Sequence, residues 1–277
     1  MLTEEQKKNR MKGIGASESA IVLGISKWMS PYELWLIKTG RMEPKSLDDV
    51  PQVYWGNVHE DSIAKKYAEE NNLRVRRVTE TLYHKDYPFL LCHLDRKIEG
   101  QKKALECKFA MFHSDKWGES GSDIVPLSYI VQIQHQLAVT GYEEADLAVL
   151  IGGWDYRWYP FKRDEEIINK IIVECEKFWR LVETGEPPEL RDRKDVQLAY
   201  PYSNGKFKEA DHLVCDDICM LVELKNKLKK IQQEKENIEE ELVKYIEDAD
   251  GIKMNDCILA TFKPTKKGKR VLRVMEK

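Results

Sequence analysis

Three ionisable residues lie within apolar stretches in the middle of this 277-residue chain. Asp95 ends one such stretch, and Glu106 and Lys108 belong to the next, residues 103–109. Charges in apolar strands are costly unless they are paired or functional. Because side chains alternate along a strand, Glu106 and Lys108 point to one face and Cys107 to the other. We therefore treat Asp95, Glu106 and Lys108 as candidate site residues.

Pairing of the two stretches through a turn at Gly100 would bring Asp95 close to Glu106. Two neighbouring carboxylates favour Mg²⁺, a hard cation that prefers oxygen ligands and keeps several waters. Such an ion activates water and stabilises the leaving oxygen of a phosphodiester. Lys108 would orient or deprotonate that water, or neutralise the phosphate. The spacing alone is equally consistent with a structural salt bridge between Glu106 and Lys108.

Two short helices and one longer helix are expected before these strands. Ser17 is the candidate N-cap of the first helix, which stops at a glycine. In the second, Ser30 is the cap, Pro31 occupies the first helical position and Glu33 completes a capping box. The third is expected over residues 58–71.

After the third helix the apolar residues alternate as in strands, and three strands are expected over residues 74–83, 89–98 and 103–109. A helix is expected next, over residues 126–140. Two further strands, over 145–151 and 156–161, and a last helix, over 164–183, complete the order. The first three strands suggest an antiparallel meander. The whole order predicts an α/β layered domain over residues 1–190.

Beyond Pro188 the composition shifts, and residues 191–277 are expected to form an appendage of one long charged helix and a basic β-hairpin. The apolar residues of that helix are spaced by three, four or seven positions, a narrow stripe typical of helix pairing. Folding of the helix back on the core is equally consistent with this stripe. Its members are Ile218, Leu221, Leu224, Leu228, Ile231, Ile238, Leu242 and Ile246.

Composition excludes several classes of protein. No apolar run approaches the roughly 20 residues of a membrane span, and the first ten residues lack a signal-peptide core, so a cytoplasmic protein is expected. The six cysteines are too scattered for a four-thiolate metal site. A net charge of −3 does not suit a protein that coats nucleic acid indiscriminately. DNA contacts would then be local, at residues 74–77 or in the tail 263–273, unless these lysines and arginines form solvated faces.

Four separated segments match one family in the same order. They are Arg10 with Gly15-Ala16-Ser17-Glu18, Trp55-Gly56-Asn57-Val58-His59-Glu60, Cys92-His93-Leu94-Asp95 with Leu105-Glu106-Cys107-Lys108, and Tyr129-Ile130-Val131-Gln132-Ile133-Gln134. The set resembles the PD-(D/E)xK nucleases, and within them the phage-type alkaline exonucleases and YqaJ-like viral recombinases, over about residues 10–185. Leu94 departs from the motif, which has proline there. The resemblance implies a restriction-endonuclease-like core, a central mixed sheet flanked by helices.

The resemblance also implies a metal site. Glu60, Asp95, Glu106 and the backbone carbonyl of Cys107 would hold Mg²⁺ or Mn²⁺, with two ions per site, and Lys108 would be the catalytic lysine. Gln132 and Tyr129, one turn apart on a helix, would help to place the lysine, the water or the substrate.

At the N-terminus, Arg10 and Ser17 match family positions that hold the terminal 5′-phosphate of DNA. A serine at a helix N-terminus presents a hydroxyl and free N–H groups to an anion, and an arginine adds a bidentate contact. Otherwise Ser17 is simply a cap and Arg10 a disordered terminal residue.

The function implied is that of a Mg²⁺-dependent 5′–3′ exonuclease of phage or prophage origin. It would resect linear double-stranded DNA in the bacterial host cytoplasm, leaving 3′ single strands for a single-strand-annealing recombinase, and it would work as a ring-shaped homotrimer. One alternative is another PD-(D/E)xK nuclease, resolvase-like or Cas4-like, the latter disfavoured because no cluster of four cysteines is evident. The other is a non-catalytic protein that binds DNA or a recombinase, in which the same carboxylates are structural.

Overall fold

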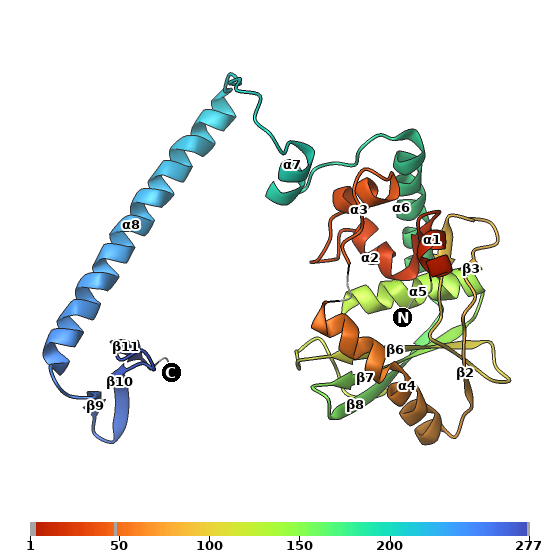
Figure 1. Cartoon of the computed structure of the whole chain (residues 1–277), viewed down its shortest axis with the longest axis horizontal. Coiled ribbons are helices and arrows are strands. Elements are labelled where there is room, and N and C mark those ends of the chain that lie inside the picture. The colour runs from red at the N-terminus through yellow and green to blue at the C-terminus, as the bar shows by residue number, and fades with distance from the viewer. Residues whose placement is uncertain (1–3, 47–48, 276–277) are drawn as a thin grey trace. The chain divides into compact units, whose positions relative to one another are not determined.

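The chain forms two compact units, Met1–Tyr202 and Ser203–Lys277, in a computed structural model that describes residues 4–46 and 49–275 (Figure 1). Among the described helices, none combines the length and apolarity needed to cross a membrane.

A five-stranded mixed sheet is the centre of the first unit. Its strand order is β2-β5-β6-β7-β8. Only β6 and β7 run parallel, and the other neighbours are antiparallel. The strands span Val75–Arg77 (β2), Arg96–Ile98 (β5), Lys103–Ala110 (β6), Glu144–Ile151 (β7) and Asp155–Lys162 (β8). The predicted turn between β5 and β6 is confirmed, with Gly100 at a φ of 76° that glycine adopts without strain.

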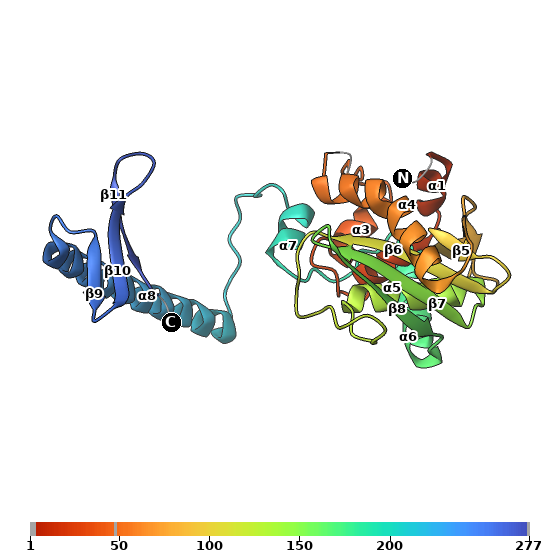
Figure 2. The same cartoon turned by 90° about the horizontal axis from the view of Figure 1, so that it is seen from below.

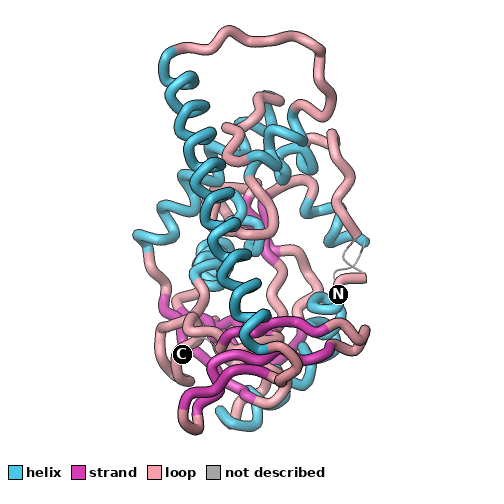
Figure 3. Tube along the Cα trace, turned by 90° about the vertical axis from the view of Figure 1, so that its left-hand side faces the viewer, coloured by secondary structure: helices cyan, strands magenta, loops and turns pink. Residues whose placement is uncertain are grey.

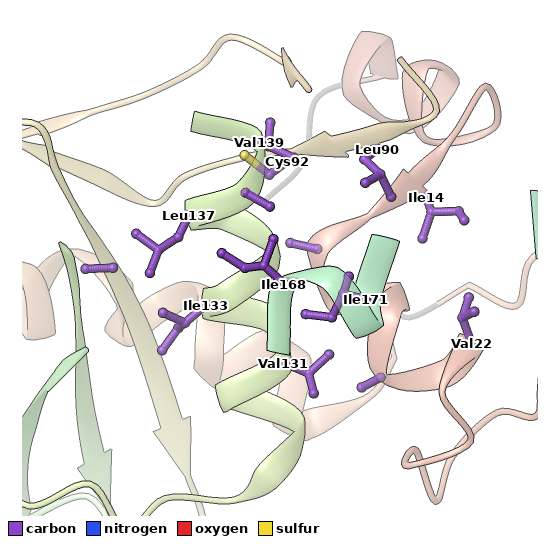
Figure 4. Close-up of a cluster of buried hydrophobic side chains, with 14 of the residues drawn as sticks. Ile14, Val22, Leu90, Cys92, Val131, Ile133, Leu137, Val139, Ile168 and Ile171 are labelled. Carbon is purple, nitrogen blue, oxygen red and sulfur yellow. The ribbon is translucent and has the colours of Figure 1, made fainter. Parts of the chain in front are cut away.

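Helices cover both faces of this sheet (Figure 2). On one face lies α4 (Pro51–Asn71), whose Ile63 and Tyr67 pack against Leu105 and Cys107 of β6. On the other face lies α5 (Leu127–Thr140), with α6 (Glu165–Thr184) behind it. Figure 4 shows the larger core on that side, where side chains of α5 and α6 meet those of the N-terminal segments. This layering confirms the predicted α/β core.

The N-terminal segments add four short helical elements and a small sheet to that side. The helical elements are α1 (Glu4–Arg10), the 3₁₀ helix η1 (Ala16–Glu18), α2 (Ser19–Val22) and α3 (Pro31–Lys38). The small sheet has the order β1-β4-β3 and consists of Ile14–Gly15 (β1), Leu90–Cys92 (β4) and Leu82–Tyr83 (β3). Strand β1 runs parallel to β4, so the N-terminal residues lie beside the segment that leads to Asp95.

Two predicted strands were wrong in their extent. Residues 74–83 and 89–98 each form two short strands, one in the small sheet and one in the central sheet. All three residues of β4 are buried, because η1 and α5 pack around it, whereas β5 follows the central sheet. A continuous run of strand-forming residues does not reveal that its two halves have different neighbours.

Two predicted helix starts also differ. The third helix begins at Pro51 rather than near residue 58, with the proline in its first turn. Ser17 is not an N-cap, since Gly15 precedes η1 and donates its N–H to the Glu18 carboxylate at 2.7 Å. Ser30 is the N-cap predicted for α3, and its Oγ accepts from the N–H of Glu33 at 3.0 Å.

The second unit contains one long helix and a three-stranded antiparallel sheet (Figure 3). These are α8 (His212–Ile246), β9 (Gly251–Met254), β10 (Cys257–Pro264) and β11 (Arg270–Val274). The predicted hairpin is β10–β11, to which β9 adds a third strand. Helix α7 (Arg193–Ala199) packs against α3 in the first unit, so the boundary falls after Tyr202 rather than near residue 190.

Candidate active site

Asp95 and Glu106 meet where β5 begins and β6 passes beside it. Asp95 immediately precedes β5, and its Oδ2 accepts the N–H of Cys107 at 2.8 Å. Glu106 lies inside β6 with 4% of its surface exposed. Burial, together with the charge of Glu106, raises the pKa of Asp95 to about 8. Asp95 therefore lacks a cation of its own that would keep it ionised at neutral pH.

Three donors hold the Glu106 carboxylate. Its Oε1 accepts from Lys108 Nζ and from Gln132 Nε2, each at 2.6 Å. Its Oε2 accepts from Gln136 Nε2, also at 2.6 Å. Gln132 and Gln136 are one turn apart on α5 and face the sheet together. Gln136 was absent from the sequence prediction, although its spacing of four from Gln132 was a usable signal.

Lys108 lies between the acidic pair and an aromatic ring. Its Nζ is 5.3 Å from the centroid of the Tyr129 ring, a cation–π distance. Burial lowers the pKa of Lys108, but the carboxylates of Glu106 and Asp95 outweigh burial and raise it above its usual range. A lysine that stays charged is suited to orienting water or neutralising a phosphate rather than to removing a proton.

Glu60 is held by an arginine that the sequence did not single out. Glu60 lies on α4, and its Oε1 accepts from Arg96 Nη1 at 2.6 Å, with Arg77 Nη2 at 3.9 Å. Glu60 is near enough for its charge to contribute to the raised pKa of Asp95. Within residues 4–46 and 49–275, no three His, Cys, Asp or Glu side chains are grouped as metal ligands. The structure thus brings Asp95 and Glu106 together and pairs Glu60 with Arg96.

The N-terminal residues form a second charged cluster. Arg10 Nη2 lies 3.2 Å from Ser17 Oγ and 3.0 Å from Glu18 Oε1. Lys38 Nζ is 2.8 Å from Glu18 Oε2. Burial raises the pKa of Glu18, but Arg10 and Lys38 outweigh it and lower the pKa below its usual value. Two basic side chains thus share one carboxylate. Burial, together with the charge of Arg10, lowers the pKa of the buried Lys38 although Glu18 opposes this, so Arg10 is the accessible cation beside the exposed Ser17. Glu18 and Lys38 were not foreseen as partners.

Both clusters adjoin the same strand. Gly15, whose N–H donates to Glu18 of the N-terminal cluster, pairs with Leu91 of β4, and the chain continues from β4 through His93 to Asp95. Burial and the charge of Arg10 lower the pKa of His93. The pairing of β1 with β4 therefore connects the cationic cluster to the acidic pair through one short segment.

Comparison with known proteins matches residues 6–143 to the YqaJ-like viral recombinase domain. The chain is also 35% identical over 249 residues to the uncharacterised protein YqaJ of Bacillus subtilis strain 168, covering 87% of this chain and 77% of that protein. The chain belongs to the YqaJ-like viral recombinase family.

Solved structures place this YqaJ-like chain in the alkaline exonuclease fold. An alkaline exonuclease from Laribacter hongkongensis, LHK-Exo, aligns with a TM-score of 0.53 at 20% identity, over 66% of this chain and 94% of the enzyme. The same enzyme in complex with dAMP aligns equally well, at 21% identity. A phage-related exonuclease from Haemophilus somnus 129PT aligns with a TM-score of 0.50 at 12% identity, over 64% and 97% of the two chains. The predicted PD-(D/E)xK core is confirmed.

In this YqaJ-like fold the order of elements explains how residues that are distant in sequence come to lie close together. The β5–β6 hairpin supplies Asp95, Glu106 and Lys108, α5 supplies Tyr129 and Gln132, and α4 supplies Glu60. Arg10 and Ser17 come together at the N-terminal end, apart in sequence from all of these.

Proposed function

We propose that this protein is a metal-dependent exonuclease that resects linear double-stranded DNA from its 5′ ends. The observation that carries the proposal is the buried group of Asp95, Glu106 and Lys108 on one hairpin of an exonuclease fold. Structural ion pairs normally balance their charges. Here the protein leaves Asp95 with a raised pKa beside a second carboxylate, an arrangement expected of a functional site.

Mg²⁺ or Mn²⁺ fits these residues. The donors are carboxylate oxygens and the Cys107 carbonyl, which are hard ligands, and a divalent cation beside Asp95 would favour its ionised form. Asp95 and Glu106 would hold the metal, two ions per site in the full proposal, and Glu60 would join after release from Arg96. When bound, the metal supplies an activated water and stabilises the leaving oxygen.

The remaining residues position the reacting groups. Gln132 and Gln136 fix the orientation of the Glu106 carboxylate through both of its oxygens. Lys108, positively charged and held over Tyr129, would neutralise the developing charge on the scissile phosphate. In this proposal Lys108 acts as a fixed cation and does not remove a proton from water.

Digestion from the 5′ end rests on the cationic cluster. Arg10 and the exposed Ser17 hydroxyl lie 3.2 Å apart, and Lys38 binds the second oxygen of Glu18, so that Arg10 and Ser17 would be available to a terminal phosphate. The complex of LHK-Exo with dAMP shows that a deoxynucleotide binds that similar enzyme. By likeness to phage-type exonucleases, the protein would form a ring-shaped homotrimer and pass the 3′ single strands to an annealing recombinase.

Digestion of linear duplexes labelled at either end, with and without a 5′-phosphate, tests the proposal. With Mg²⁺ we expect loss of label from the 5′-phosphorylated strand first and no digestion of closed circles. Glu106→Gln and Lys108→Ala should each slow digestion by about 100-fold or more, whereas Lys102→Ala, in the exposed β5–β6 turn, should not. Undiminished digestion by both variants would exclude this site, and digestion from 3′ ends would exclude the polarity.

The same assay separates the other classes. A resolvase-like enzyme would cut branched duplexes and spare blunt linear ones. A non-catalytic DNA-binding protein would digest neither, and its acidic group would bind no Mn²⁺ in calorimetry, because a structural ion-pair cluster has no ligand position to offer.

A further inference from the structure

The core of the second unit is too small to bury the apolar side chains of its long helix, α8. Helix α8 runs for 35 residues, yet Ile246 and Ala260 are the only buried side chains among the described residues of this unit. Along α8, Leu224, Leu228 and Ile231 are 54%, 64% and 62% exposed. A helix with a polar surface and an open apolar stripe is stable when another surface covers that stripe.

The open stripe has the heptad spacing of a coiled coil. Alternating steps of three and four residues place one set of side chains at the a positions and a second set at the d positions. The a positions are Leu221, Leu228, Lys235 and Leu242, and the d positions are Leu224, Ile231, Ile238 and Tyr245. The side chains at the d positions are all more than half exposed. This regularity favours a helix as the missing partner rather than an irregular surface.

The C-terminal half of the stripe is a groove. It has a volume of about 380 Å³, and its apolar floor and wall are Ile231, Ile238 and Leu242 of α8 with Val274 of β11. Its lining is completed by the two carboxylates of Glu234 and Glu239 and the one ammonium group of Lys235, so its polar part is net acidic. An occupant that matches it is an apolar helix face flanked by basic residues.

The N-terminal half of α8 has this composition. Its stripe there consists of Leu221, Leu224 and Leu228, flanked by Lys225 and Lys227. A straight helix cannot fold back on itself, so the N-terminal half that occupies the groove must come from another molecule. We propose that α8 pairs with α8 of a second copy of this chain in an antiparallel coiled coil. Three chains of one ring cannot all pair two by two, so in the proposed homotrimer the second copy belongs to another ring.

One register of this pair matches both the apolar residues and the charges. It places Leu224 opposite Leu242 of the second copy, Leu228 opposite Ile238, Ile231 opposite Lys235 and Leu221 opposite Tyr245. In the same register, the flanking Lys225 faces Glu239 of the second copy and Lys227 faces Glu241. Each of these contacts occurs twice because the pair has two-fold symmetry.

A parallel pair is less favourable. In register, it would place Lys235 opposite the same lysine of the second copy inside the seam, and Glu234 opposite Glu239 at its edge. The antiparallel pair leaves one like-charge contact, between Glu234 and Glu234 of the second copy. Lys235 is adjacent to Glu234 in sequence. Lys235 therefore favours the antiparallel orientation, as single polar residues do in other coiled coils.

Disulfide trapping in the full-length protein tests the orientation. Leu224→Cys and Leu242→Cys are made as separate variants, each with the exposed Cys215, Cys219 and Cys257 changed to serine. We expect a crosslinked dimer after mild oxidation only when the two variants are mixed and allowed to exchange. Crosslinking of either variant alone would overturn the proposal in favour of a parallel pair. Absence of crosslinking in every sample would overturn pairing at this stripe.

Sedimentation of the full chain tests the charge pattern. Lys225→Glu with Lys227→Glu should halve the mass in solution, and the addition of Glu239→Lys with Glu241→Lys should restore it. A matched control, Lys229→Glu with Lys230→Glu, changes the same charge outside these contacts and should leave the mass unchanged. A mass that is insensitive to the first pair of changes would contradict the proposal. These readouts do not depend on nuclease activity, so they remain valid if the proposed function fails.

Discussion

At the scale of single residues, the site depends on how one buried carboxylate is held. Glu106 uses both oxygens, with Lys108 and Gln132 on one and Gln136 on the other. A carboxylate that accepts from opposite sides cannot rotate, which fixes the direction from which it can meet a metal. In the proposed site Gln136 is therefore a positioning residue, and it lies outside the four segments on which the sequence resemblance rests.

Gln136→Leu should weaken Mn²⁺ binding by about 10- to 100-fold, the usual cost of losing an outer partner of a metal ligand. The physical reason is that Glu106 Oε2 loses its donor and the carboxylate becomes free to turn toward Lys108. Titration calorimetry with Mn²⁺ measures the change. Gln101→Leu, at an exposed position of the β5–β6 turn, is the matched control and should bind as wild type does. Equal affinity of both variants would mean that Lys108 and Gln132 suffice to hold Glu106.

At the scale of elements, α5 links the site to the N-terminal helices. One face of α5 carries Gln132 and Gln136 to the sheet, and another carries His135 to α2 and β4. His135 Nδ1 is 2.5 Å from Ser19 Oγ, and its Nε2 is 3.0 Å from the carbonyl oxygen of Leu91. Cys175 of α6 lies 3.7 Å from Ser19 Oγ. Burial lowers the pKa of His135 to about 4, so this joint between elements requires a neutral imidazole.

Because these contacts need a neutral His135, we expect the stability of the fold to be sensitive to acid. The unfolded chain binds a proton at His135 near pH 6.5 and the folded chain only near pH 4, so stability is lost as pH falls between these values. We expect the wild type to lose about 2 to 3 kcal/mol more between pH 7 and pH 4.5 than His135→Gln, which cannot titrate. Urea unfolding followed by tryptophan fluorescence measures this in the first unit, because all seven tryptophans lie there.

His212→Gln is the matched control, since His212 is exposed at the start of α8. It should show the wild-type dependence on pH. If the His135 variant also lost stability as steeply as the wild type, the acid sensitivity would have to come from the carboxylates instead.

At the scale of the whole molecule, the first unit ends later than its exonuclease-like core. Helix α7 is anchored by Asp195, which is fully buried and accepts from Ser30 Oγ and from the N–H of Arg191. Lys194 forms an ion pair with the buried Glu33. The other oxygen of Glu33 lies 3.3 Å from Lys45 Nζ. These contacts support the N-cap of α3, and they make α7 part of the unit that contains the site.

Two truncations should therefore behave differently. A chain of residues 1–202 should melt within about 2 °C of the full-length protein, because it keeps every contact of α7. A chain of residues 1–190 loses Lys194, one of the two partners of the buried Glu33, and Asp195, the partner of Ser30. At a cost on the order of 3 kcal/mol it should melt about 5–10 °C lower. Thermal unfolding followed by tryptophan fluorescence compares the two. Equal melting temperatures would show that α7 contributes nothing to the first unit.

Local patterns in the sequence determined much of the site. Alternation along β6 put Glu106 and Lys108 on one face and Cys107 on the other, and Gly100 marked the turn that brings Asp95 alongside. Capping signals located the start of α3 at Ser30 and the end of α5 at Gly141. These features depend on the few residues around each position, so a linear pattern contains them.

Tertiary structure alone decided which partners these residues have. Arg96 donates to Glu60, Lys38 to Glu18 and Gln136 to Glu106, and the partners are up to 36 positions apart in the chain. The division of residues 74–98 between two sheets was likewise decided by the helices packed around β4. Such pairings depend on which surfaces the folded core places side by side, and a buried charge accepts whichever partner the packing brings within reach.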